Sequence, residues 1–178
     1  KSVKKGYFFL FIWNIIIDRL LLPDNMGSVH SLNINPHGGV PKYPVKKIRI
    51  GTYGIEGDKQ NDLKYHGGPT RAVCIFSLEK ITALQAEGNP ISSGSTGENI
   101  TIKGIDWDLL KMGLEIYIGE VCIKLTGVAP PCKTINKSFN DGRFNRISEK
   151  SNPGWSRWYA SVIKKGVINS GDIVSIQD

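Results

Sequence analysis

The amino-acid sequence predicts a single, mainly β domain, a barrel or a sandwich, with a few short helices. Short segments in which apolar and polar residues alternate recur along the chain, as in strands that bury one face. The 20 glycines among 178 residues indicate many tight turns between such strands. A chain of this length suits one continuous core, so a multidomain enzyme is not expected.

Residues 1–25 differ in composition from the rest of the chain. Three lysines precede an apolar run over residues 7–17, but Asp18 and Arg19 interrupt it before it reaches the length of a membrane span. Because Met26 is the first methionine, we expect residues 1–25 to be an apolar extension outside the native protein. Residues 26–178 then form the single folded domain. Membrane association would follow only if the extension is genuine.

One helix is expected near the middle of the chain. Ser77 can cap its N-terminus, since a serine hydroxyl accepts hydrogen bonds from the backbone N–H groups of the first turn. Leu78, Ile81 and Leu84 follow at the spacing of one helix face, and Gly88 suits the left-handed position that ends a helix. We expect this helix to cover an opening or an edge of the sheet.

Four segments are expected to be strands. Residues 114–118 and 121–125 alternate around Gly119 and Glu120, a two-residue connection typical of a type II′ hairpin. Residues 98–102 and 172–176 each follow a glycine-containing turn that would set the start of the strand.

The cysteines indicate a reducing compartment and one reactive thiol. Three cysteines cannot all pair, and none has the C-x-x-C spacing of a zinc site or a redox dithiol, so we expect a cytoplasmic protein. Cys74 and Cys122 lie in apolar alternating segments and are expected in the core. Cys132 follows two prolines that fix the backbone and precedes Lys133, and a thiol beside a cation tends towards the thiolate. The chemistry is therefore expected to centre on Cys132.

A glycine-rich polar segment over residues 54–73 is the second candidate site. Gly67 and Gly68 can expose backbone N–H groups to an anion, and Arg71 offers a planar guanidinium for phosphate or carboxylate. A structural alternative is a turn held by an ion pair between Asp58 and Arg71. The net charge of +7 favours an anionic partner but does not choose among a phosphorylated ligand, nucleic acid and a membrane.

Five motifs together resemble the MOSC domain family, named after the C-terminal domain of molybdenum cofactor sulfurases: GGVPK at 38–42, GDKQND at 57–62, HGGPTRAV at 66–73, GEN at 97–99 and PC at 131–132. The likeness is strongest to the small stand-alone bacterial members, and it extends from about Met26 to the end of the chain. It implies a mostly β barrel of the pyruvate-kinase β-barrel-like type. It also implies binding of molybdenum cofactor or transfer of sulfur.

The resemblance assigns a role to Cys132. In relatives that hold the cofactor, such as the mitochondrial amidoxime reducing component, the matching cysteine is a molybdenum ligand. This chain has Ala129 and Pro130 where Pro-Arg is common in the family, so an arginine is missing at that point.

The leading hypothesis is a molybdenum-dependent oxidoreductase that reduces N-hydroxylated small molecules, since some relatives detoxify N-hydroxylated bases. Cys132 is then both a catalytic residue and the metal ligand, with His66 and Asp58 as further catalytic candidates. Seven residues are expected to bind the phosphorylated pterin of the cofactor (Mo-molybdopterin): Arg71, Gly67, Gly68, Glu98, Asn99, Lys42 and Lys133. An electron-transfer protein is an expected partner.

Two alternatives stay open. Without molybdenum, Cys132 is a persulfide sulfur carrier that takes sulfur from another protein such as a cysteine desulfurase, because this chain contains no pyridoxal-phosphate domain. A basic nucleic-acid-binding module is the remote alternative, based on the positive charge and on Trp155, Arg157, Trp158 and Tyr159. Structural packing explains those aromatic residues at least as well, so nucleic acid is not the expected partner.

Overall fold

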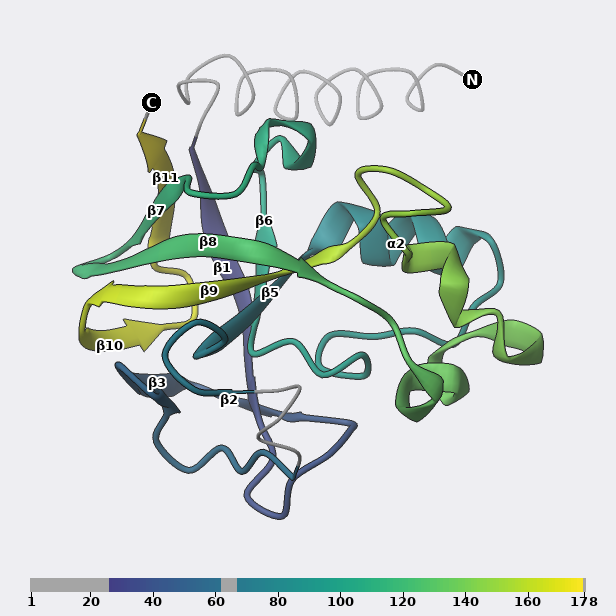
Figure 1. The fold of residues 1–178 in the computed structure, drawn as a ribbon, viewed down its shortest axis with the longest axis horizontal. Helices are drawn as coiled ribbons and strands as arrows, with labels where there is room; N and C mark the ends of the chain where they lie inside the picture. Colours follow the sequence, from purple (N-terminus) through teal and green to yellow (C-terminus); the bar gives the residue numbers. More distant parts are fainter. Residues whose placement is uncertain (1–25, 62–66, 178) are drawn as a thin grey trace, which may run out of the picture.

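A closed ring of hydrogen-bonded strands forms the body of the protein (Figure 1). The computed structural model describes residues 26–61 and 67–177. Seven strands follow one another around the ring in the order β11, β7, β8, β9, β5, β6 and β1, and the pairing of β1 with β11 closes it. The mainly β prediction is confirmed, and of the two architectures expected the protein adopts the barrel.

The elements have the following bounds. The barrel strands are β1 (Met26–Ile34), β5 (Val73–Ser77), β6 (Ile100–Lys103), β7 (Glu115–Ile118), β8 (Val121–Ala129), β9 (Arg157–Lys164) and β11 (Ile173–Gln177). Outside the ring, β2 (Tyr43–Val45) pairs with β1, and a separate sheet contains β10 (Gly166–Asn169), β3 (Lys47–Gly51) and β4 (Gly54–Ile55). The described helices are α2 (Leu78–Ala86) and the 3-10 helices η1 (Trp107–Leu109), η2 (Lys133–Ser138), η3 (Asn140–Gly142) and η4 (Phe144–Ile147).

Strand β1 closes the barrel because it pairs with two neighbours in succession. Residues 26–28 pair with β11 and residues 28–32 pair with β6, both antiparallel. A register shift between Val29 and Ser31 accompanies the pairing with β6 and bends the strand locally. Gly27 lies where β1 and β6 approach most closely, since a Cβ atom there would collide with the backbone oxygen of Lys103. A glycine at this position therefore permits closure.

The helix α2 belongs to the connection between β5 and β6, which run parallel. Parallel neighbours need a crossover, and α2 packs against both strands as it makes one (Figure 1). The Ser77 hydroxyl accepts a hydrogen bond from the Lys80 backbone N–H at 3.2 Å, and Gly88 has φ of +87°. The predicted helix is thus confirmed with both of its ends. No helix in the described part of the chain is both long and apolar enough to cross a membrane.

Three of the four predicted strands lie within a residue of their expected starts, and one begins later. The hairpin of β7 and β8 is confirmed, with Gly119 at φ +55° and no positive φ at Glu120, as a type II′ turn requires. The strand expected over residues 98–102 begins at Ile100. Glu98 and Asn99 precede it because their buried side chains hydrogen-bond to neighbouring loops instead of alternating with the sheet.

The hydrophobic core is rich in isoleucine side chains. The largest fully buried residues come mainly from strands β1, β5, β6, β7 and β8 of the ring and from α2, among them Phe76, Ile81, Ile100, Ile116 and Ile123. Branched side chains pack well on a pleated surface, which explains why strands with this composition form the core.

Replacing Gly27 by alanine is expected to lower the free energy of unfolding by roughly 1–3 kcal/mol, because the added methyl group must push β6 away from β1. Urea denaturation measures the loss. Gly127→Ala is the matched control, since no heavy atom lies within 4 Å of a Cβ at that position. Equal stability of the two variants would show that the close approach at Gly27 does not matter for closure.

Candidate functional site

A cavity of about 780 Å³ brings together most of the sequence motifs. Its walls are formed by Cys74 on β5, the C-terminal end of β8, the start of β9 and loop residues 39–42, 59–61, 67–71, 96–99 and 130–135, of which only some face the cavity. A volume of this size accommodates a ligand as large as a cofactor. Loops that are far apart in sequence therefore converge on one site.

Cys132 lies at the mouth of this cavity, where β8 has ended and η2 begins. Pro130 and Pro131 carry the chain out of the sheet, because proline cannot donate a ladder hydrogen bond. The thiol is exposed, and its sulfur lies 3.0 Å from the Thr134 hydroxyl oxygen. The cysteine predicted to carry the chemistry is thus accessible from the cavity.

A buried ion pair between Lys42 and Asp58 anchors one wall of the cavity. The exposed fractions of the two side chains are 9% and 2%. The Asp58 carboxylate also accepts hydrogen bonds from the Asn35 backbone N–H at 2.8 Å and from the Asn99 side-chain amide at 3.0 Å. The cation that pairs with Asp58 is therefore Lys42, from an earlier loop, and not Arg71 as the structural alternative supposed.

Asn99 connects this network to the barrel. Its side-chain oxygen accepts a hydrogen bond from the Cys74 backbone N–H at 3.2 Å, while its amide nitrogen donates to Asp58 and to the Asn33 backbone oxygen. Every polar atom of the side chain is thus used inside the protein. Asn99 lines the cavity but serves chiefly to fix the Asp58 carboxylate against β5.

Arg71 lines the cavity beside the ring of Tyr159. Its guanidinium carbon lies 5.8 Å from the centre of that ring, a distance that suits a cation–π contact. Gly67 also lines the cavity. Gly67 has φ of +85° and Gly68 has φ of +73°, values that residues with a side chain rarely adopt. Burial raises the pKa of Tyr159, so its phenol keeps its proton at physiological pH.

Four of the predicted site residues that the structure describes do not line this cavity: Asp58, Gly68, Glu98 and Lys133. Glu98 is fully buried behind the wall, where its carboxyl accepts hydrogen bonds from the Gly94 N–H at 2.6 Å and the Thr96 hydroxyl at 2.7 Å. Burial raises its pKa, against those hydrogen bonds. Lys133 is exposed and does not line the cavity, and His66 lies outside the described residues.

Sequence reasoning missed two residues of the cavity wall. Cys74 is buried, as predicted, but it also faces the cavity, and burial raises the pKa of its thiol to about 11. Arg157 is only 6% exposed and contributes its guanidinium to the same wall. All five residues of β5 are buried, so alternation along that strand could not have shown which side faces the cavity. The inward position of Arg157 beside Tyr159 follows from strand pairing.

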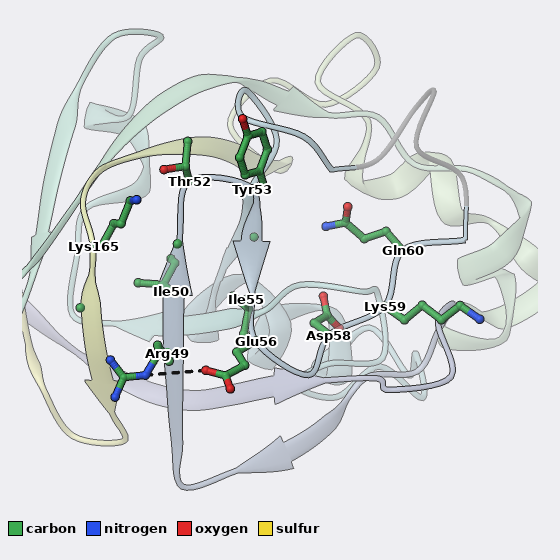
Figure 2. Close-up of a pocket in the computed structure, with 13 residues that line it drawn as sticks. Arg49, Ile50, Thr52, Tyr53, Ile55, Glu56, Asp58, Lys59, Gln60 and Lys165 are labelled. Carbon is green, nitrogen blue, oxygen red and sulfur yellow. Dashed lines mark ion pairs between the residues drawn. The ribbon is translucent and has the colours of Figure 1, made fainter.

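A second pocket of about 940 Å³ shares a wall with the first (Figure 2). Lys59 and Gln60 line both, and Figure 2 shows their side chains extending in opposite directions from the loop after β4. Exposed Tyr53 and the ion pair of Arg49 with Glu56, 3.7 Å between charged atoms, mark this second pocket. Of the predicted site residues that the structure describes, only Asp58 lines it.

A family model for the MOSC domain matches residues 62–175. The chain belongs to the MOSC domain family. The resemblance seen in the sequence motifs is thereby confirmed, and the matched region contains Arg71, Asn99 and Cys132.

Two curated MOSC relatives are similar over most of this chain. The uncharacterised protein YflK of Bacillus subtilis is 27% identical over 135 residues, which are 75% of this chain and 60% of YflK. Protein YiiM of Escherichia coli is 29% identical over 128 residues, which are 70% of this chain and 56% of YiiM. The chain therefore spans less than two thirds of the length of either relative.

Solved structures of other proteins share the fold. The crystal structure of Escherichia coli YiiM aligns with 86% of this chain and 70% of its own, with a TM-score of 0.65 and 21% identity. That of YuaD from Bacillus subtilis aligns with 85% of this chain and 95% of its own, with a TM-score of 0.65 and 18% identity. The barrel is thus common to these proteins at low sequence identity.

Replacing Lys42 by methionine is expected to lower the free energy of unfolding by about 3–5 kcal/mol, because the buried Asp58 carboxylate then lacks its cation. Adding Asp58→Asn should cause less loss than the sum of the single changes, with a coupling of at least about 1 kcal/mol. Urea denaturation of the four proteins of this cycle measures the coupling. Strict additivity would contradict the buried pair.

Iodoacetamide at about pH 7.5 is expected to modify Cys132 much faster than the two buried thiols, because only Cys132 is exposed. Raising the pH to about 9 should still leave Cys74 unmodified, since burial raises the pKa of its thiol to about 11. Mass spectrometry of the folded protein gives the rate at each site. Comparable labelling of Cys74 and Cys132 in the folded protein would refute this description of the cavity wall.

Proposed function

We propose that this domain binds a phosphorylated pterin cofactor of molybdenum in the cavity, with Cys132 as the ligand from the protein. One observation carries the proposal: an exposed thiol opens onto a cavity in which every charged lining residue that the structure describes is a cation. Among the described lining residues four are cations, Lys42, Lys59, Arg71 and Arg157, and none is aspartate or glutamate. Such a lining attracts an anion, and low-dielectric walls strengthen the attraction.

The donor set suits the cofactor. A thiolate is a soft ligand and matches the sulfur-rich environment that the pterin dithiolene gives to molybdenum. Arg71 can hold a phosphate through two parallel N–H groups, and the glycines before it leave room for close approach of the backbone. When bound, the cofactor would supply two-electron redox chemistry.

The protein residues would position the ligand. The ion pair with Asp58 fixes Lys42 in the wall, so Asp58 acts as a positioning residue rather than as a proton donor. Tyr159 keeps its phenolic proton because burial raises its pKa, and it lines the cavity. It therefore meets a ligand as a neutral polar group that holds its proton tightly.

We propose N-hydroxylated small molecules, such as N-hydroxylated bases, as the substrate class. Their reduction takes two electrons and two protons: the N–O bond breaks, an N–H bond replaces it, and the oxygen leaves as water. The electrons must come from outside this chain, which calls for a redox partner protein. The three free cysteines support a cytoplasmic site of action.

A persulfide carrier is the second candidate, and the exposure of Cys132 favours it. In this function the Cys132 thiolate attacks the terminal sulfur of a donor persulfide, and the donor leaves as a thiolate. The cationic cavity has no evident role in that reaction. For this reason the cofactor proposal accounts for more of the site.

The test is the metal and pterin content of the full chain purified from a host that makes the cofactor. Wild-type protein is expected to carry molybdenum and pterin in equal amounts, and Cys132→Ser should lose most of both because the soft ligand is gone. Cys122→Ser is the matched control, since Cys122 is buried away from the cavity lining.

Stoichiometric persulfide on Cys132, with neither molybdenum nor pterin in the wild-type protein, would establish the carrier and eliminate the cofactor proposal. Full molybdenum and pterin content in Cys132→Ser would show that the thiol is not needed to bind the cofactor.

A further inference from the structure

We infer that Arg157 is an anion-binding residue of the cavity and supplies, from the neighbouring strand, the guanidinium that the segment before Cys132 lacks. The inference rests on the proposed function only in naming its ligand, a phosphate group. Binding of an anion at this place can be tested without the cofactor.

Strand register places Arg157 beside the altered motif. In the pairing of β8 with β9, Arg157 lies opposite Ala129, the last residue of β8. Its Nη2 atom approaches the Pro130 backbone oxygen at 3.4 Å. An arginine on β9 therefore reaches the segment in which family members commonly carry one, although 27 residues separate Arg157 from Pro130 in sequence.

The positive charge of Arg157 is buried without an ion pair. The residue is 6% exposed, and its guanidinium donates hydrogen bonds to the neutral backbone oxygens of Thr96 and Pro130. Its Nε atom is buried and has no hydrogen-bond partner. Among the ion pairs of the described residues none includes Arg157. A buried charge of this kind is destabilising unless something compensates it.

The nearest buried acid is a weak counter-ion. The two carboxyl oxygens of Glu98 accept hydrogen bonds from the Gly94 N–H and from the hydroxyls of Thr96 and Thr101. Burial raises its pKa, and the charge of Arg157 acts in the opposite direction without forming an ion pair with the carboxyl group. A ligand anion in the cavity would complete the charge balance.

The charge of Arg157 acts on the cavity wall. Burial raises the pKa of the Cys74 thiol, and the largest opposing influence on that pKa is the positive charge of Arg157. Gly97 lies in the loop beside the guanidinium and has φ of +88°. A Cβ atom at this position would lie 2.9 Å from a Val40 methyl group and 3.8 Å from Nη1 of Arg157.

A purely structural role would not need this charge. Arg157 could serve only to tie the loop at Thr96 to Pro130, but both acceptors are neutral carbonyl oxygens. A neutral side-chain amide can also donate to such oxygens, with weaker hydrogen bonds but at a lower cost of burial. The choice of a guanidinium at a buried position that lines the cavity points to an anion.

The experiment titrates inorganic phosphate into the full chain by calorimetry and compares three variants with the wild type. Arg157→Gln removes the charge and keeps an amide donor, so its phosphate dissociation constant is expected to rise by about tenfold or more. Arg157→Lys keeps the charge without the fork and should fall between the two. Arg49→Gln is the matched control: it removes the same charge from an exposed side chain outside the cavity and should leave phosphate affinity unchanged.

A second measurement on wild-type protein covers the case in which the Arg157 variants fail to fold. The side-chain Nε–H signal of Arg157 in the nitrogen-15 spectrum is expected to shift on addition of phosphate and to saturate, while that of Arg49 stays in place. Phosphate affinity in Arg157→Gln equal to wild type, an unmoved Arg157 signal, or no phosphate binding by the wild type would each overturn the inference. The molybdenum and pterin content tests the proposed function separately, so the two can fail independently.

Discussion

The buried carboxylate of Asp58 is the contact on which the site depends. It holds Lys42 by an ion pair and takes hydrogen bonds from the Asn35 backbone and the Asn99 amide, so three loops from different parts of the chain meet at one charge. A buried carboxylate that loses a partner costs several kcal/mol, which keeps each partner in place. The barrel provides the frame, and Asp58 fixes the loops on that frame before any ligand arrives.

The same arrangement decides the sign of the field in the cavity. Asp58 points its charge into the protein network and away from the cavity, and Glu98 is buried behind the wall. The cations of Lys59 and Arg157 therefore act on the cavity without a facing carboxylate among the described lining residues. An exposed thiol in such a field is well placed to meet an anionic ligand that brings its own metal.

Local signals in the sequence were enough to predict much of the fold. The helix cap at Ser77, its end at Gly88 and the hairpin at Gly119 depend on hydrogen bonds and backbone angles within a few residues, and all three are confirmed. The motifs likewise identified the loops that carry Cys132 and Arg71 to the cavity.

Features set by pairing between distant segments could not be predicted. The position of Arg157 opposite Ala129 depends on the register of β8 against β9, and the partner of Asp58 depends on where the loop of Lys42 folds back. Cys74 lies on a strand buried on both faces, so no alternation showed that it faces the cavity. The role of Lys133 was suggested by adjacency in sequence, yet its side chain lies outside the cavity lining.

The central claim is that the Cys132 sulfur and the cationic cavity together hold a molybdenum cofactor. X-ray absorption at the molybdenum edge tests it most directly, on cofactor-loaded wild-type protein and on Cys132→Ala reconstituted with the same cofactor. The account predicts one more sulfur neighbour of molybdenum in the wild type than in the variant. Identical sulfur coordination in the two proteins would contradict it.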